Sequence, residues 1–149
     1  GATREHMAHF VVNNRTNALM NERGYWFNER PELLSEEDYL NSRMISEPYC
    51  IHDCDLPIQG CAAYLVTSAD RAKQAPHNPA YLVGYGDGSH PSTKQGPLEE
   101  FQLFAGSIGK ELWQSTGMGP DDIDTANLYD GFSFVVYLYL EKFVMDWQG

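Results

Sequence analysis

The sequence predicts an α/β fold built on a mostly parallel sheet. Three segments, 60–67, 81–85 and 123–128, have the apolar composition of buried strands, and segments with helical periodicity follow each of them. This alternation of strand and helix implies parallel strands joined by right-handed crossovers. With 149 residues, 42% hydrophobic and 21% charged, the chain has the size and composition of one globular domain.

Two helices are predicted before the first strand. Thr3 is a candidate N-cap, and the apolar residues after it lie on one face of an amphipathic helix that runs to about residue 20. Ser35 and Asp38 have the spacing of a helix-start box, which opens a short helix to about residue 43. The segment 21–34 between them is predicted to be a loop with an aromatic surface, and 49–56 is predicted to be extended or irregular.

Three helices are predicted after the first strand. Ser68 is placed to cap a short one, and residues 98–115 carry apolar side chains at helical spacing, with Gly117 as the C-cap. Residues 132–143 are apolar on every side, so this last helix should be buried on every side. In an isolated chain it would expose a contiguous apolar face.

The formal net charge of −11 argues against nucleic acid as a partner, because phosphate binding needs a basic face. The longest apolar region, 132–145, is too short and too interrupted to cross a membrane, and no apolar core of a signal peptide follows the first residues. The three cysteines are odd in number. Without a secretory signal, they favour a reduced, cytoplasmic compartment.

Cys50, His52 and Cys54 have a spacing that a metal ion could in principle use. No second cluster of Cys and His completes a zinc site in the sequence, so no metal is expected. The preferred interpretation is that the cysteines are small buried thiols beside a strand.

The most informative stretch is Tyr129-Asp130-Gly131-Phe132-Ser133, between the third predicted strand and the apolar helix. It resembles the strand-to-helix corner with which thiolases stabilise an enolate, although that family usually has Asn or His where this chain has Tyr129. Five more phrases resemble the same family, in its order and at its intervals: Ser42-Arg43-Met44-Ile45-Ser46-Glu47-Pro48, Asp53-Cys54-Asp55-Leu56-Pro57, Gly60-Cys61-Ala62-Ala63, Thr67-Ser68-Ala69-Asp70-Arg71-Ala72 and Asp121-Asp122-Ile123-Asp124.

The resemblance is to the thiolase superfamily, in its sterol-carrier and lipid-transfer-protein type, and covers roughly residues 3–143. It implies half of a five-layer αβαβα thiolase-like fold. Residues 1–57 then correspond to loop-domain and linker helices, and residues 58–149 to the start of an incomplete C-terminal α/β domain. Because the family's nucleophilic Cys lies in the other half, the resemblance implies a C-terminal-half fragment that is inactive alone.

Tyr129 changes the expected chemistry. Cleavage of a carbon–carbon bond beside a CoA thioester leaves an enolate, which needs hydrogen-bond donors at the thioester oxygen and an acid for the carbon. Thiolysis also needs a cysteine to accept the acyl group, whereas retro-aldol cleavage needs none. The resemblance implies a catalytic acid/base role for Tyr129, as in the steroid side-chain aldolase branch, with Asp130 orienting the corner. Alternatively, the Tyr129 ring packs under the following helix and its hydroxyl bonds a carbonyl.

Several other residues are candidates for binding. Tyr25 and Trp26 lie where the family inserts the loop domain that covers CoA and the acyl chain, so the resemblance implies a lipid or steroid contact, with an ordinary interface as the alternative. Ser68 faces the CoA side or serves only as a helix cap. Tyr85 and His90 are further candidates, although a His-Pro pair in a polar loop is usually a turn.

Together these features predict part of a thiolase-like acyl-CoA enzyme of lipid or sterol metabolism. It would cleave or form a carbon–carbon bond next to the thioester, by aldolase chemistry rather than thiolytic acyl transfer. CoA enters as the substrate's carrier, and no cofactor is expected. The resemblance implies a homodimer, an acyl-CoA or steroid-CoA substrate and an OB-fold partner protein. The alternatives are a non-catalytic binding or scaffold module with the thiolase fold and a truncated inactive fragment.

Overall fold

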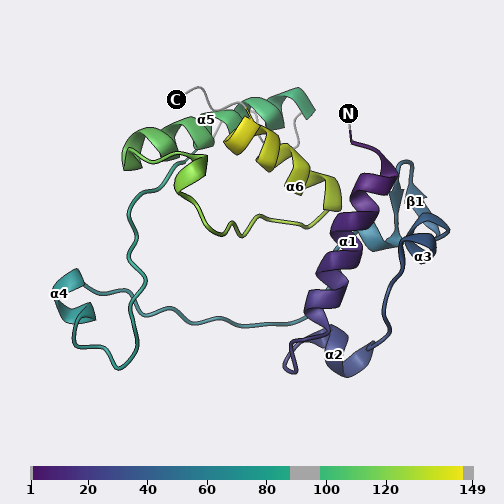
Figure 1. Ribbon diagram of the computed structural model, residues 1–149, viewed down its shortest axis with the longest axis horizontal. Helices are drawn as coiled ribbons and strands as arrows, with labels where there is room; N and C mark the ends of the chain where they lie inside the picture. The colour runs from purple at the N-terminus through teal and green to yellow at the C-terminus, as the bar shows by residue number, and fades with distance from the viewer. Residues whose placement is uncertain (1, 88–97, 146–149) are drawn as a thin grey trace. The chain divides into compact units, whose positions relative to one another are not determined.

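The computed structural model describes residues 2–87 and 98–145 as a mixed helix and sheet structure (Figure 1). Two compact units account for the chain. The first contains Gly1–Ile58 and Ala126–Glu141, and the second contains Gln59–Thr125 and Lys142–Gly149. The division of the sequence at residue 57 stays a prediction, because the first unit also includes a later part of the chain.

The first unit is built around helix α1, Arg4–Ala18, which begins after Thr3 as predicted. Helix α3, Glu36–Leu40, packs against it and begins at the predicted box: the Asp38 N–H donates to Ser35 Oγ at 3.0 Å. The Arg4 guanidinium donates to the Leu40 carbonyl at 3.1 Å and so satisfies one of the open acceptors at the end of α3. The buried core of this unit contains Met7, Ala8, Leu34, Tyr39 and Cys50.

Two parts of the first unit differ from the sequence prediction. Helix α2, Tyr25–Glu29, forms inside the predicted loop, and the Asn28 side chain stabilises its first turn by donating to the Gly24 carbonyl at 2.9 Å. Strand β2, Tyr49–Cys50, lies in the region predicted to be extended or irregular. It pairs antiparallel with strand β1, Met44–Ser46, which lies before that region and was not predicted. The 3-10 helix η1, Ile51–Asp53, follows the hairpin directly.

The last helix of the first unit is α6, Ser133–Leu140, and the chain continues into the π-helical turn η3, Glu141–Met145. Four of the residues of α6 are buried: Ser133, Val135, Val136 and Leu138. The helix predicted over 132–143 is confirmed over Ser133–Leu140. Phe132 and Leu140 at its two ends are 46% and 38% exposed, and the expected contiguous apolar face stays a prediction.

The second unit contains the short helix α4, Ala69–Ala72, the long helix α5, Leu98–Thr116, and the 3-10 helix η2, Pro120–Asp122. Gly117 follows α5 with φ of 67°, a left-handed conformation that suits glycine, so the predicted C-cap is confirmed. The Trp113 indole of α5 donates to the Phe143 carbonyl at 2.9 Å.

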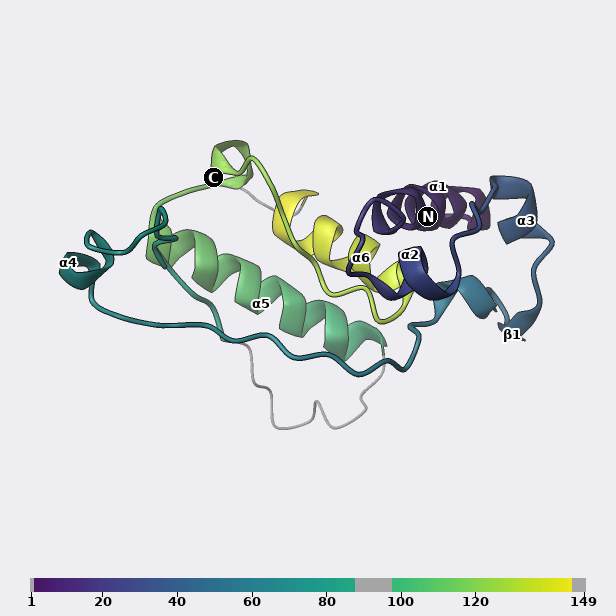
Figure 2. The same ribbon diagram turned by 90° about the horizontal axis from the view of Figure 1, so that it is seen from below.

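The three predicted strands 60–67, 81–85 and 123–128 are wrong for this chain. Figure 2 shows the teal segments on either side of α4 as extended chain without strand arrows, and Leu65 is 94% and Leu82 88% exposed. Among the described residues the only sheet is the antiparallel pair β1–β2, so the predicted parallel sheet is absent there. A central strand needs ladder partners and covering layers, and apolar composition alone supplies neither.

Candidate functional site

The candidate site lies in the first unit, at the corner Tyr129-Asp130-Gly131-Phe132-Ser133 that leads into α6. The segment after η1 runs beside this corner. The Asp55 N–H donates to the Gly131 carbonyl at 3.1 Å, and Cys54 forms an antiparallel bridge with Phe132. Residues more than 70 positions apart in the sequence are thus joined by main-chain hydrogen bonding.

A buried carboxylate holds the helix end of the corner. Asp53 is 2% exposed, and its Oδ1 accepts from the Tyr39 hydroxyl at 2.5 Å and from the Ser133 hydroxyl. Its Oδ2 accepts from the Cys50 N–H at 2.7 Å. Burial, followed by the hydrogen bond to Asp53, raises the pKa of Tyr39 far above its ordinary value, so this phenol remains a donor at physiological pH.

Tyr129 is 65% exposed, and its ring turns back over Gly131. A Cβ built on Gly131 would collide with the Tyr129 hydroxyl, so the absence of a side chain at Gly131 makes room for the phenol. Such exposure does not fit the structural alternative, in which the ring packs under the helix. The catalytic role of Tyr129 stays a prediction.

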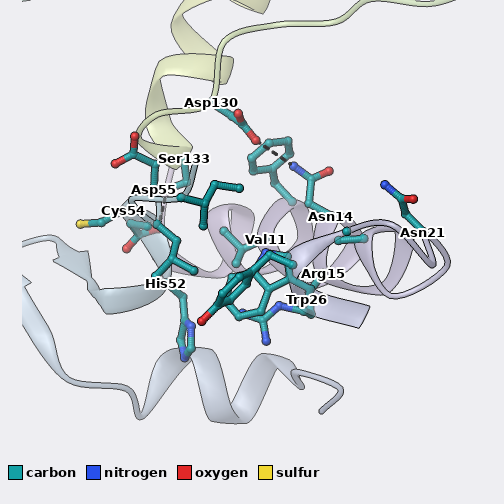
Figure 3. A pocket seen from close by; sticks show the side chains of 17 residues that line it. Val11, Asn14, Arg15, Asn21, Trp26, His52, Cys54, Asp55, Asp130 and Ser133 are labelled. Carbon is teal, nitrogen blue, oxygen red and sulfur yellow. Dashed lines mark hydrogen bonds between the residues drawn. The ribbon is translucent and has the colours of Figure 1, made fainter. Parts of the chain in front are cut away.

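Asp130 connects the corner to α1 and borders a cavity. The Asn14 side-chain amide donates to Asp130 Oδ2 at 3.4 Å, as the dashed line in Figure 3 marks. This contact is consistent with a carboxylate that orients the corner, which is the role predicted for Asp130.

The cavity beside the corner has a volume of about 460 Å³. Side chains of α1, of α2 and its preceding turn, and of the segment 52–58 line it together with Asp130 and Ser133 (Figure 3). The apolar part of the lining consists of Phe10, Val11, Ala18, Tyr25, Trp26, Leu56 and Ile58.

The charged groups at the cavity are mostly acidic. Arg15 is the one arginine or lysine of this lining. It stacks on Trp26, with its guanidinium carbon 3.4 Å from the ring centroid. Asp53, Asp55 and Asp130 contribute three carboxylates. Burial, and then the nearby Arg15 charge, lower the pKa of His52, which favours its neutral form. The cavity therefore suits an uncharged, apolar group better than phosphates.

The predicted binding residues separate in the structure. Tyr25 and Trp26 both line the cavity and contact each other edge to face, with centroids 5.5 Å apart. Ser68 belongs to the second unit, where it stands at the N-cap position of α4 without a side-chain capping bond. Tyr85 is in the second unit and 70% exposed, and His90 lies outside the described residues.

The cysteines match their predicted environment only in part. Cys50 is buried, Cys54 is half-buried and Cys61 is exposed, so the interpretation of all three as buried thiols is wrong for Cys61. Within residues 2–87 and 98–145, no group of three or more His, Cys, Asp or Glu side chains is arranged to hold a metal ion. No helix of that same part of the chain has both the length and the apolar character needed to cross a membrane.

Sequence reasoning missed Asp53 and Ser133 as members of the site. Both stand inside phrases that carry the thiolase resemblance, Asp53 as the first residue of one and Ser133 as the last of another. Asp53 has His52 before it and Asp55 two residues after it, so the local sequence does not indicate a buried carboxylate. Nothing in the sequence connects it to a hydroxyl 80 positions away.

No family model matches the chain. Among curated proteins, it is 37% identical over 147 residues to a steroid side-chain-cleaving aldolase of Thermomonospora curvata. It is 31% identical over 147 residues to a 17-hydroxy-3-oxo-4-pregnene-20-carboxyl-CoA lyase of Mycobacterium tuberculosis. Each similarity covers 95% of this chain and 37% of the relative, so the chain spans little more than a third of their length.

A solved structure, the Ltp2-ChsH2(DUF35) aldolase, resembles the fold of this chain. The TM-score is 0.70 at 33% identity, and the similarity covers 96% of this chain and 38% of that one. The two relatives and this structure all have names that denote aldolase or lyase chemistry, and two of the names refer to steroids. The chain is thus similar, over almost its whole length, to parts of aldolases and lyases that include steroid-acting ones.

Proposed function

We propose that this chain is part of an aldolase that cleaves the side chain of a steroid-CoA thioester, with Tyr129 as its acid/base. The observation that carries the proposal is the Tyr129 corner: an exposed phenol stands on a segment held by main-chain bonds and a buried carboxylate. The names of the similar proteins support the same chemistry.

The proposed reaction is a retro-aldol cleavage of a β-hydroxy thioester. A base removes the proton of the β-hydroxyl, the carbon–carbon bond breaks, and its electron pair forms the enolate of the CoA ester while the β-carbon becomes a ketone. An acid then protonates the enolate carbon. Tyr129 is proposed to donate a hydrogen bond to the developing oxyanion or to transfer one of these protons.

For the lyase substrate, 17-hydroxy-3-oxo-4-pregnene-20-carboxyl-CoA, this cleavage breaks the bond between C17 and C20. The products are a 17-ketosteroid and propionyl-CoA, and atoms balance without any acceptor or cofactor. No acyl group is transferred, so the reaction does not require a cysteine nucleophile from this chain.

The cavity of the first unit is proposed to take an apolar part of the substrate. Trp26 and Tyr25 supply aromatic faces, and the acidic groups Asp55 and Asp130 disfavour the CoA phosphates there. Ser68 remains a proposed contact on the CoA side.

The complete cytoplasmic enzyme is proposed to have the thiolase-like five-layer fold of the sterol-carrier and lipid-transfer-protein type. Segments 60–67, 81–85 and 123–128 would then pair as strands, which would cover their exposed apolar side chains. An OB-fold partner and a second copy of the enzyme are proposed to complete the assembly.

The test uses the full-length protein that carries this chain, with and without an OB-fold partner. The 17-hydroxy steroid-CoA is supplied, and the 17-ketosteroid and propionyl-CoA are measured by mass spectrometry. Tyr129→Phe should lower kcat by about 100-fold or more, since acid–base groups contribute roughly that much.

The matched control is Tyr137→Phe. It removes a phenol of α6 that donates to the His6 carbonyl at 2.6 Å and is outside the cavity lining, so kcat should stay within about twofold. Absence of cleavage by the wild-type protein, with or without a partner, would leave the non-catalytic binding module as the better description. Equal activity of Tyr129→Phe and wild type would refute the acid/base role.

A further inference from the structure

Asp53 is a buried ionisable group that the proposed reaction does not use. It is 2% exposed, and its three donors come from three places: the Tyr39 hydroxyl of α3, the Cys50 N–H of β2 and the Ser133 hydroxyl at the start of α6. An ionised carboxylate only accepts hydrogen bonds, so it imposes a direction on each of these donors.

Ser133 is the first residue of α6 and the last of the corner. Its hydroxyl donates to Asp53 Oδ1, and the side chain is itself 2% exposed. A negative charge beside the first turn of a helix is also favoured by the helix dipole. Asp53 therefore holds α6 at its first turn, the end that follows the corner of Tyr129, rather than at a remote turn.

The neighbouring residues of the corner are held as well. The Gly131 carbonyl accepts from the Asp55 N–H at 3.1 Å, and Phe132 pairs with Cys54. Asp53, Cys54 and Asp55 are thus consecutive residues that hold the consecutive residues 131–133 of the corner. Such a two-stranded attachment sets the direction in which the chain leaves Gly131 toward Tyr129.

We infer that Asp53, acting through the Ser133 hydroxyl, is a positioning residue that holds the Tyr129 phenol in the geometry of catalysis. The inference rests on the proposed function. Asp53 is proposed to act through Ser133 and not on the reacting atoms, and Ser133 sets where the corner ends and α6 begins. Displacement of a reacting group by about 1 Å can cost on the order of 100-fold in rate, so a modest shift of the corner should be measurable.

The experiment compares two variants of the full-length protein that each remove one hydroxyl from the same carboxylate oxygen. Ser133→Ala removes the bond to the corner, and Tyr39→Phe removes the bond to α3 while the Cys50 N–H still holds Asp53 Oδ2. Ser133→Ala should lower kcat on the order of tenfold with KM within about twofold, because positioning acts on the transition state. Tyr39→Phe should leave kcat within about twofold of the wild-type value, even if it lowers the thermal midpoint as much as Ser133→Ala does.

Hydrogen exchange supplies a readout that does not depend on activity. In Ser133→Ala, amides in peptides covering residues 129–136 and the Asp55 amide should exchange faster than in wild type, whereas in Tyr39→Phe they should stay protected. An equal loss of kcat in both variants, in proportion to stability, would assign Asp53 a purely structural role and overturn the inference.

Failure of the proposed function gives a different pattern. If the wild-type protein cleaves no steroid-CoA, or Tyr129→Phe is fully active, the chemistry proposed for the corner is refuted by those assays alone. The exchange data then decide the remaining part: faster exchange in Ser133→Ala alone still supports Asp53 as the group that holds the corner, and unchanged exchange overturns that too.

Discussion

Gly131 has no side chain at the point where the phenol of Tyr129 lies. A methyl group on residue 131 would collide with the Tyr129 hydroxyl. Because the Tyr129 ring is exposed, it can turn away from such a group. Gly131 does not have a positive φ, so alanine fits its backbone without strain. At the residue scale, Gly131 therefore controls where the phenol stands rather than how stable the corner is.

Gly131→Ala should thus separate the position of Tyr129 from its chemistry. We expect kcat for steroid-CoA cleavage to fall on the order of tenfold, because the phenol must turn away, while the free energy of unfolding changes by about 0.5 kcal/mol or less. Gly106→Ala in α5 is the control, since its added Cβ meets only Lys142 Cδ at 3.8 Å, an ordinary contact. A wild-type kcat for Gly131→Ala would show that the orientation of the phenol is unimportant.

At the scale of elements, the 3-10 helix η1 carries a histidine that couples the cavity to pH. Burial, and then the nearby Arg15 charge, lower the pKa of His52, whose ring lies 6.5 Å from that of Tyr39. A group whose folded-state pKa is lowered contributes stability above its unfolded pKa, near 6.5, and that contribution is lost as the pH falls through the folded value.

The thermal midpoint should therefore decrease as the pH is lowered from 7.5 to 5. The variant His52→Gln should show a smaller decrease over the same range. The measurement is thermal unfolding by circular dichroism across this range for wild type and variant. His77→Gln is the control, because His77 is exposed and stands outside the cavity lining. Identical slopes in wild type and His52→Gln would show that His52 does not titrate differently on folding.

At the scale of the whole molecule, the apolar side chains left uncovered belong to the predicted strands. Tyr64, Leu65 and Val66 are 88%, 94% and 91% exposed, and Leu82 is 88% exposed. Unpaired apolar segments of this kind associate with one another or with other chains. These segments therefore add a second apolar surface to the one predicted for the helix of 132–143.

The 149 residues alone should self-associate. We expect size-exclusion chromatography to give species larger than a monomer, and circular dichroism to show a broad melt. Leu65→Lys should reduce this association in the isolated chain, yet destabilise the full-length enzyme, where the proposed strand is buried. A monodisperse, cooperatively melting chain with no response to Leu65→Lys would contradict this expectation and favour an independent binding module.

Local features of the sequence determined most of the helices. Capping residues and apolar periodicity, both local signals, predict the approximate boundaries of α1, α3 and α5. The Ser35 box and Gly117 are examples. The corner of Tyr129 was also readable, because its phrase and its neighbours resemble one family in order and spacing. These signals are encoded within short stretches, so they need no knowledge of what packs against them.

Only the tertiary structure decided the pairings between distant residues. Segments far apart in the sequence meet at three places: the hydrogen bond from Ser133 to Asp53, the bridge of Cys54 with Phe132, and the cavity that Trp26 lines. The strand predictions failed for the same reason. Apolar composition indicates that a segment favours burial, but a strand forms only where a neighbouring strand supplies its hydrogen bonds. A sequence states the preferences of its residues, but partners depend on how the whole chain folds.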